Sequence, residues 1–376
     1  MEIYLDNLAS TPIDPRVAAH HAEVAVALRG NPNSAEHASG TQSANVLTKS
    51  REDVGVFLGA AREETHFLPS ASSALWLALE DAIAQRGVGL RVLASAIEHP
   101  SLLRHLQAAA AAGRIRLELF PVDAQGQPDL PRLKEMAQRG VDLICAMAAN
   151  NEIGNITPVE DILRLADRQG ALTIVDASQA AGRFGLAQVT AAANYVVASG
   201  AKMNGPRRVG VLAGKIKRPT ADLVEPMFGT PDAAAASAMA LACGLAADEM
   251  EHDERRIALL RDRLEAILTE RVPGLRVNGD RTARLAGALH VSSPAIPAEV
   301  LVARLWGKVA LSSGAACQSG VPGPSHVLTA MGLEEWVVEG GVRMCVGKFN
   351  DAAEIERAGA IISEAMGADL GIRRQA

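Results

Sequence analysis

Short apolar runs alternate with helix-like periodicity between about residue 55 and residue 215. Runs of this kind, without a strict polar and apolar alternation, are typical of strands that helices cover on both faces of a parallel sheet. The pattern therefore predicts an α/β domain with a mainly parallel sheet flanked by helices. The four clearest strands are RVLASAI (91–97), VDLICAMA (141–148), ALTIVDA (171–177) and NYVVAS (194–199).

The clearest helix is predicted in the stretch ITPVEDILRLADRQG, residues 156–170. Thr157 can cap it, Pro158 suits its first turn, and Glu160 completes a capping box. Gly170 is the kind of residue that ends a helix. A predicted strand follows immediately, as expected for an α/β unit.

The pattern changes beyond about residue 248, where a long charged helix is predicted over 248–271. Shorter strand-like runs such as GALHVSS follow, and a closing helix is predicted at about 351–366. A chain of 376 residues can form more than one core. We expect a large α/β domain over 13–247 and a smaller α+β domain formed by 1–12 and 248–376.

The composition, with 48% hydrophobic and 21% charged residues, is that of a soluble globular protein. The net charge of -6 and the lack of a basic run argue against nucleic-acid binding, because nucleic-acid binders concentrate positive charge. We find no signal-peptide pattern in the first thirty residues and no uninterrupted apolar stretch long enough to cross a bilayer. The expected location is therefore the cytoplasm, without a membrane partner.

The four cysteines show no C-x-x-C pairing, so neither a disulfide framework nor a metal site is indicated. Cys145 and Cys243 stand in apolar runs, and we expect both in the core. Cys317 stands instead in LSSGAACQSG (311–320), a stretch rich in serine and glycine. This setting suits a thiol that must move or react.

An acid and a lysine follow two of the predicted strands. Asp176 ends the strand 171–177, and Lys202 comes shortly after Ser199, the end of the strand 194–199. In an open parallel sheet, ligands bind at the carboxyl ends of the strands. Pyridoxal phosphate needs a lysine for its Schiff base and a carboxylate beside its pyridine nitrogen. The alternative for the same two residues is a plain surface ion pair.

A phosphate group needs hydrogen-bond donors at the start of a helix. Ser70, Ser72 and Ser73 lie just before an apolar helical run, where free N–H groups and the helix dipole favour an anion. Ordinary serine capping explains them equally well. His99 follows another strand end and could stack on a flat cofactor and move protons, or be structural.

These stretches resemble the cysteine desulfurases, which are class V aminotransferase-like enzymes of PLP fold type I. The resemblance spans nearly the whole chain and consists of eight stretches in the family's order: IYLDNLASTPIDPRV, GNPNSAEHASG, SAIEHPSLL, ANNEIGNITPV, VDASQAAGR, SGAKMNGP, SSGAACQSG and VRMCVGKFN. It implies a large PLP-binding domain and a smaller α+β domain that carries the cysteine loop.

The resemblance implies a role for each matching residue around the cofactor. Lys202 is similar to the Schiff-base lysine, Asp176 to the partner of the pyridine nitrogen, and Gln179 to a donor to the phenolic oxygen. Asn151 is similar to an asparagine near that oxygen and the substrate, and His99 to the histidine that stacks on the ring.

Further matches concern the phosphate, the substrate and the sulfur. Ala71, Ser72 and Ser199 match phosphate-binding positions, and Thr230 is the candidate for the threonine that reaches the partner subunit's phosphate. Arg343 matches the arginine that binds the substrate carboxylate, a task suited to its bidentate fork. Cys317 matches the nucleophile whose thiolate takes sulfur from L-cysteine and holds it as a persulfide.

The resemblance implies a PLP-dependent enzyme that converts L-cysteine to L-alanine and a Cys317 persulfide. A homodimer and a sulfur-acceptor protein, as in iron–sulfur cluster assembly, are the expected partners. Two alternatives remain open: another class V enzyme, such as a selenocysteine or cysteine-conjugate lyase, or a non-catalytic paralogue that serves as a binding subunit.

The chain departs from the family at several positions. Ala201 replaces the histidine that usually precedes the lysine, and Ser70 to Ser73 replace a Gly-Ala-Thr-Glu phosphate turn. The segment after the lysine strand is shortened to EPMFGTPDAAAA, and the usual lysine–glycine pair is Arg207 and Arg208. We therefore expect a divergent member.

Overall fold

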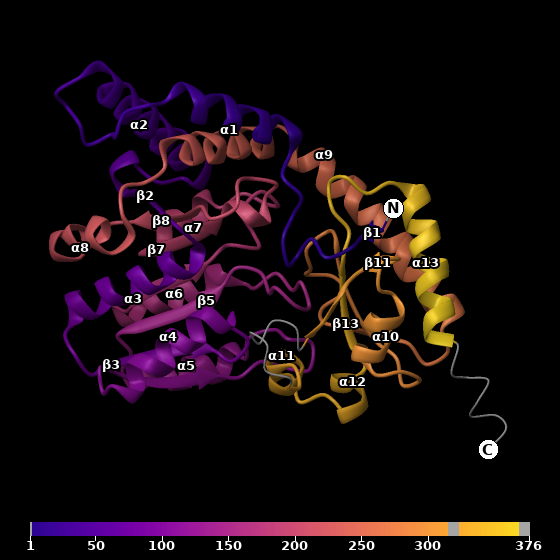
Figure 1. Ribbon diagram of the computed structural model, residues 1–376. Coiled ribbons are helices and arrows are strands. Elements are labelled where there is room, and N and C mark those ends of the chain that lie inside the picture. The colour runs from indigo at the N-terminus through magenta and orange to yellow at the C-terminus, as the bar shows by residue number, and fades with distance from the viewer. Residues whose placement is uncertain (1, 315–322, 368–376) are drawn as a thin grey trace.

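The computed structural model describes residues 2–314 and 323–367. A mixed sheet of seven strands forms its largest part, and helices cover both of its faces (Figure 1). Its strand order is β2 (Thr65–Leu68), β8 (Gly210–Gly214), β7 (Tyr195–Ser199), β6 (Leu172–Asp176), β5 (Leu143–Met147), β3 (Leu90–Ser95) and β4 (Ile115–Phe120). Strands β7, β6, β5, β3 and β4 run parallel, while β8 is antiparallel to both of its neighbours. The predicted fold class and all four predicted strands are confirmed.

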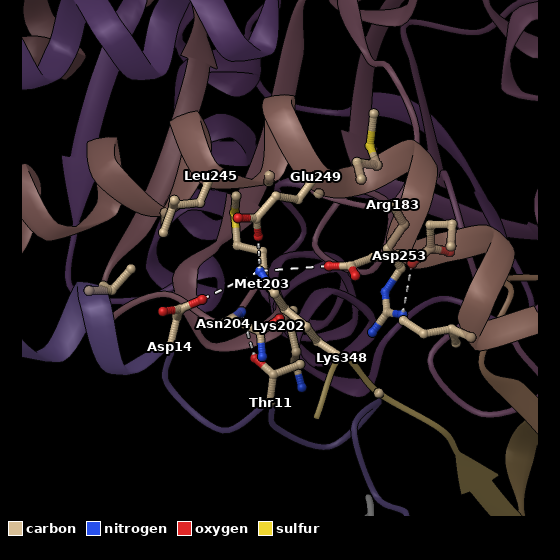
Figure 2. A pocket seen from close by; sticks show the side chains of 18 residues that line it. Thr11, Asp14, Arg183, Lys202, Met203, Asn204, Leu245, Glu249, Asp253 and Lys348 are labelled. Atoms are coloured by element: carbon tan, nitrogen blue, oxygen red, sulfur yellow. Dashed lines mark hydrogen bonds and ion pairs between the residues drawn. The ribbon is translucent and has the colours of Figure 1, made fainter. Parts of the chain in front are cut away.

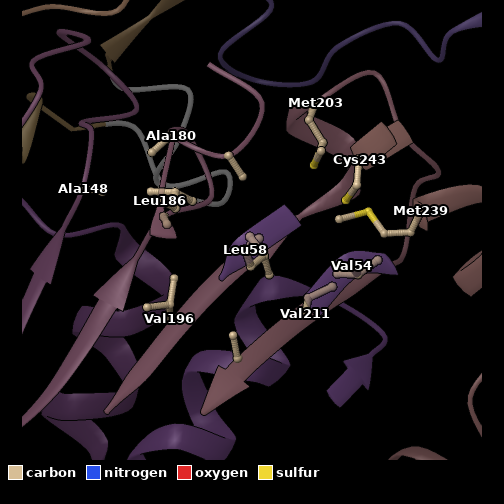
Figure 3. Packing of buried hydrophobic residues seen from close by; sticks show 14 of the residues in the cluster. Val54, Leu58, Ala148, Ala180, Leu186, Val196, Met203, Val211, Met239 and Cys243 are labelled. Atoms are coloured by element: carbon tan, nitrogen blue, oxygen red, sulfur yellow. The ribbon is translucent and has the colours of Figure 1, made fainter. Parts of the chain in front are cut away.

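Helices connect these strands and pack on the sheet. They are α1 (Pro15–Ala27), α2 (Ala38–Leu58), α3 (Ala71–Arg86), α4 (Pro100–Ala111), α5 (Leu130–Gln138), α6 (Val159–Gln169), α7 (Ala187–Ala192) and α8 (Arg218–Phe228), with 3-10 turns η1 (Arg62–Glu64) and η2 (Gly200–Lys202). One core cluster lies between the sheet and the helices α2, α6 and α9 (Ala233–Arg271); Val196, Val211, Leu58 and Met239 pack in it (Figure 3). Strands that are apolar on both sides are buried by this arrangement.

The prediction that Thr157 caps the helix α6 is wrong. The helix begins at Val159 with Pro158 at the N-cap position and without a side-chain cap. Thr157 instead follows the isolated β-bridge between Ala149 and Ile156, and its N–H donates to the carbonyl of Ala148. Gly170 ends the helix in the left-handed conformation, with φ 63°, as predicted.

A four-stranded antiparallel sheet organises the second part of the molecule, in the order β12 (Ser312–Ser313), β13 (Gly341–Cys345), β10 (Ala288–Ser292) and β9 (Arg276–Asn278). The amino-terminal strand β1 (Ile3–Tyr4) pairs with β11 (Val309–Ala310) in this part. Its helices are α10 (Ala298–Arg304), α11 (His326–Ala330), α12 (Glu335–Glu339) and α13 (Ala352–Gly367). This part has a separate apolar core, formed by the first strand, the end of α9, the sheet and α13.

Helix α9 is longer than the sequence predicts. It begins at Ala233, with Asp232 accepting hydrogen bonds from the N–H groups of Ala234 and Ala235, and runs without a break to Arg271. It packs on α1 and α2 at one end and on α13 at the other (Figure 1). The expected boundary between 247 and 248 therefore falls inside one continuous helix.

The same helix is long and apolar enough, by length and composition alone, to cross a membrane, contrary to our reading of the sequence. One such helix among the described residues is weak evidence for a membrane span, and 44% of its apolar window is buried inside the structure. The helix packs on α1, α2 and α13, and a core helix passes the same test.

Candidate active site

A cavity of about 220 Å³ lies where the parallel strands β5, β6 and β7 end. Met147, Asp176 and Ser199 are the last residues of these strands, and all three line it. The other lining residues are Ser70, Ala71, Ser72, Leu75, His99, Ser101, Ala149, Asn151, Ser178, Gln179 and Lys202. Eight of the predicted site residues are thus brought together: Ala71, Ser72, His99, Asn151, Asp176, Gln179, Ser199 and Lys202.

Lys202 reaches the cavity from the 3-10 turn η2, which follows strand β7 directly. Its ammonium group donates to the backbone oxygens of Leu8, at 3.0 Å, and of Ala9. The amino-terminal segment therefore holds the lysine amine at the cavity wall.

Asp176 is 5% exposed, and its Oδ1 accepts a hydrogen bond of 2.9 Å from the N–H of Ser178. A buried carboxylate stabilises a neighbouring positive charge. The position at the end of the central strand β6 fixes this carboxylate at the cavity. Asp176 can therefore keep a ring nitrogen protonated.

His99 is the N-cap of helix α4, where its Nδ1 accepts from the N–H of Ser101 at 3.2 Å. Burial lowers the pKa of His99; the charge of Asp176 opposes this, while Lys202 and Arg343 add to it. An imidazole whose Nδ1 accepts and whose pKa is lowered is neutral, with its proton on Nε2. His99 thus offers a neutral ring to the cavity.

The first turn of helix α3 forms another wall. Ser70 caps this helix, because its Oγ accepts from the N–H of Ser73 at 3.1 Å, and Ala71 and Ser72 follow in the first turn. Gly210 of β8 packs against the backbone of Ser70 so closely that a side chain there would collide with it. The helix start is therefore fixed at the cavity, where its N–H groups and dipole favour a phosphate.

Three buried polar atoms at the cavity have no hydrogen-bond partner among the residues that the structure describes: Asn151 Oδ1, Ser178 Oγ and Gln179 Oε1. Such atoms are costly unless a ligand or water satisfies them. Together with the lysine, the carboxylate and the helix start, they fit a flat, polar, phosphorylated ring such as pyridoxal phosphate. The amide nitrogen of Gln179 donates to the carbonyl of Leu8 at 2.8 Å, so its predicted donation to the phenolic oxygen remains a prediction.

Arg343, on strand β13, does not line this cavity but contacts a residue that does. Its Nη1 donates to the backbone oxygen of Asn151 at 2.8 Å, and its Nη2 forms an ion pair of 2.7 Å with Asp6. The residue lies opposite Ser312 of β12 in the sheet register. The predicted carboxylate-binding arginine is thus held between the cavity and the strand that leads to the cysteine loop.

Besides Arg343, one more predicted residue in the described part of the chain does not line the cavity. Thr230 lies just beyond the end of α8, where its Oγ1 donates to Glu225 at 3.0 Å, and it does not line the cavity of its own chain. Cys317 lies outside the described residues. The roles of both residues remain predictions.

Comparisons with known proteins agree with this geometry. The family described as "Aminotransferase class-V" matches residues 3–226. "Probable cysteine desulfurase, mitochondrial" of Dictyostelium discoideum is 31% identical over 369 residues, which cover 94% of this chain and 80% of that protein. The chain belongs to the class V aminotransferase family, among the cysteine desulfurases.

Further cysteine desulfurases show the same relationship. "Cysteine desulfurase, mitochondrial" of Drosophila melanogaster is 32% identical over 366 residues, covering 94% of this chain and 78% of that protein. A solved structure described as "NifS-like protein" superimposes with a TM-score of 0.88 at 27% identity, covering 98% of this chain and all of the other. The similarity therefore extends over both parts of this desulfurase.

A second cavity, which Lys202 also lines, holds a cluster of charged side chains (Figure 2). The ammonium group of Lys348 is surrounded there by carboxylates, with oxygens of Asp14 at 3.3 Å, Glu249 at 2.5 Å and Asp253 at 3.7 Å. These groups come from the amino-terminal segment, from helix α9 and from the loop after β13. The backbone oxygens that bind Lys202 belong to the same amino-terminal segment as Asp14. The cluster around Lys348 therefore connects this segment to both parts of this desulfurase.

Our sequence reasoning missed two buried acids beside the site, Glu98 and Glu152, which are 0% and 1% exposed. Glu98 Oε1 accepts from the N–H of Met147 at 2.6 Å, and burial, with a smaller effect of Asp176, raises its pKa well above the usual range. A signal was present, because each acid adjoins a predicted site residue, His99 or Asn151.

Proposed function

We propose that this protein releases sulfur from L-cysteine with pyridoxal phosphate, yielding L-alanine and a persulfide on Cys317. The observation that carries the proposal is the cavity in which Lys202, Asp176 and the first turn of α3 meet. This cofactor requires three groups: an amine that can bind it covalently, a carboxylate for its ring nitrogen, and a helix start that binds its phosphate. Membership among the cysteine desulfurases supports the choice of substrate.

When bound, the cofactor would supply an electron sink for the substrate's α-carbon. Ala71, Ser72 and Ser199 would hold its phosphate, Asp176 its ring nitrogen, and Gln179 and Asn151 its phenolic edge. Lys202 would supply the amine that holds the cofactor covalently, and the same amine would accept and donate a proton.

Arg343 would orient the substrate through its carboxylate. The thiolate of Cys317 would attack the substrate sulfur, so that a sulfur–sulfur bond forms and the carbon–sulfur bond breaks. The electron pair of that bond stays on the substrate carbon, which takes up a proton to give alanine. The persulfide then passes its outer sulfur to an acceptor thiol.

We also infer the surroundings of the reaction. An acceptor protein such as an iron–sulfur scaffold would take the sulfur, and a homodimer would let Thr230 approach the partner subunit's site. The cytoplasm is the compartment we propose, since the cysteines that the structure describes are free thiols and such thiols persist in a reducing environment.

The test is a visible spectrum of the purified protein with added pyridoxal phosphate, before and after L-cysteine, followed by alanine measurement. We expect a cofactor absorbance that changes on adding cysteine, and alanine in the presence of a thiol reductant. The Cys317→Ala variant should keep the cofactor absorbance and lose sulfur transfer. Alanine formation that survives this substitution would indicate a lyase instead, and a protein that cannot take up the cofactor would indicate a binding subunit.

A further inference from the structure

Glu152 lies at the junction of the cofactor cavity and the small antiparallel sheet. It belongs to a tight turn after β5, in which the side chain of Asn150 accepts from the N–H groups of Glu152, at 2.8 Å, and Ile153, at 2.9 Å. Its neighbour Asn151 lines the cavity and accepts from Arg343. The turn therefore presents adjacent residues to the cavity and to the second part of the molecule.

The carboxylate of Glu152 contacts both sides of the segment 315–322. Ser325 donates its hydroxyl hydrogen to Glu152 Oε1, and the same hydroxyl accepts from the N–H of Leu328 at 3.1 Å, capping α11. Gly314 packs against the same carboxylate oxygen so closely that a Cβ there would collide with it and would lie 2.9 Å from Ser325 Cβ. One buried carboxylate thus touches the residue directly before the segment and a residue three positions after it.

The other groups near the Glu152 carboxylate, His290 and Arg343, do not form a hydrogen bond with it as Ser325 does. His290 Nε2 is 3.8 Å from Glu152 Oε1, which is too long for a hydrogen bond, and burial keeps His290 neutral by lowering its pKa to about 3. Arg343 contributes a more distant positive charge that opposes the rise in the pKa of Glu152 caused by burial. The hydrogen bond from Ser325 is therefore the direct interaction that anchors the carboxylate.

We propose that Glu152 is a positioning residue for sulfur transfer: it fixes Gly314 and Ser325, the described residues on either side of the segment that contains Cys317, against the turn that carries Asn151. The inference rests on the proposed function, since it concerns the step in which the Cys317 thiol attacks. It predicts that Glu152 acts on this step and leaves cofactor and substrate binding unchanged.

The test compares Glu152→Ala and Glu152→Gln with the wild-type enzyme. We expect Glu152→Ala to lower the turnover number for alanine formation by at least about tenfold, because a small displacement of a reacting group is costly. The cofactor absorbance and the cysteine concentration that half-saturates its spectral change should stay as in the wild type. Glu152→Gln keeps an acceptor for Ser325, and its turnover should stay within about threefold of the wild type, which a merely structural account of the charge would not predict.

Glu335→Ala is the matched control, because it removes an exposed carboxylate from helix α12 of the same part of the molecule. It should leave turnover unchanged. Wild-type turnover in Glu152→Ala would overturn the inference, and so would a loss that cofactor occupancy fully explains. If the wild-type enzyme itself forms no alanine, the proposed function fails first, and the two failures are therefore distinguishable.

Ser325→Ala provides a second line of evidence if Glu152→Ala does not fold. It should lower turnover as Glu152→Ala does, again with unchanged cofactor absorbance. Where both variants fold, the double variant should lose no more than the worse single variant, since both substitutions break one interaction. Losses that add in the double variant, or full activity of Ser325→Ala, would overturn the inference.

Discussion

The guanidinium group of Arg343 donates a hydrogen bond of 2.8 Å to the backbone oxygen of Asn151, 192 residues earlier in the chain. The second guanidinium nitrogen pairs with Asp6. One buried side chain therefore connects the cofactor cavity, the amino-terminal segment and the small sheet. If Arg343 binds the substrate carboxylate as we propose, these contacts hold its fork in place beforehand, which would lower the ordering cost of binding.

Arg343→Lys should weaken cysteine binding, because an ammonium group cannot serve Asn151, Asp6 and a carboxylate with the same geometry. We expect the KM for cysteine to rise at least about tenfold, in line with the loss of one charge-assisted hydrogen bond. Steady-state kinetics measure this. The control is Arg276→Lys, which changes an arginine on strand β9 of the same sheet that pairs with the exposed Glu334. It should leave KM unchanged.

Lys202→Ala should abolish alanine formation, since no other lysine lines the cavity among the described residues. The cofactor absorbance that depends on a covalent link should disappear as well, which a spectrum of the variant mixed with pyridoxal phosphate would show. Lys215→Ala changes an exposed lysine just after β8, next to the start of β7 and not to the end of β7 where the cavity lies, and should retain both properties. Alanine formation by the Lys202 variant would contradict the assignment.

Lys348→Gln should destabilise the protein by about 1–3 kcal/mol, because it leaves the buried carboxylate of Asp14 with one charged partner fewer. Asp14 is 2% exposed, so water cannot replace the lost interaction. Urea unfolding measures the change. Lys49→Gln removes the exposed pairs with Glu52 and Asp53 on α2 and should cause no measurable loss.

Acid should destabilise the protein partly through His290. Burial, with a smaller effect of Arg343, lowers its pKa to about 3 in the folded state, whereas an unfolded histidine has a pKa of about 6.5. Above about pH 6.5, His290 is neutral in both the folded and the unfolded state. Below that pH, His290 binds a proton in the unfolded chain but stays neutral in the folded protein until about pH 3. The contribution to stability is therefore complete above about pH 6.5 and falls by up to about 1.4 kcal/mol per pH unit down to about pH 3.

Unfolding free energies measured between these pH values test this linkage. His290→Gln should flatten the dependence, and His252→Gln, which changes an exposed histidine on α9, should leave it unaltered. An unchanged slope in the His290 variant would mean that the pH dependence comes from another group, which takes up its proton when the chain unfolds.

The predicted strands were recognisable because they are buried on both faces, so that their sequences are continuously apolar. Strand β4 escaped recognition. It lies at the edge of the sheet, and its polar residues Arg116 and Glu118 interrupt the apolar run. Helix α9 was predicted to start too late, since its alanine-rich first turns carry no contrast between apolar and polar positions.

The site residues that lie at the ends of adjacent strands, such as Asp176 and Ser199, could be predicted from the sequence. Contacts between distant segments could not. The carbonyl groups that hold Lys202, and the meeting of Glu152 with Ser325, depend on tertiary packing that leaves no periodic mark on the sequence. The family resemblance gave roles to residues, but it did not indicate which of their neighbours fix them in place.

The uninterrupted helix α9 has a mechanical consequence. With 39 residues at a rise of about 1.5 Å each, it is a strut of about 58 Å shared by both halves of the molecule. Because each residue turns a helix by about 100°, one amino acid inserted near its middle would swivel one half against the other by that angle. We therefore expect helix α9 to tolerate amino-acid substitutions far better than insertions or deletions, in contrast to the loops of this protein.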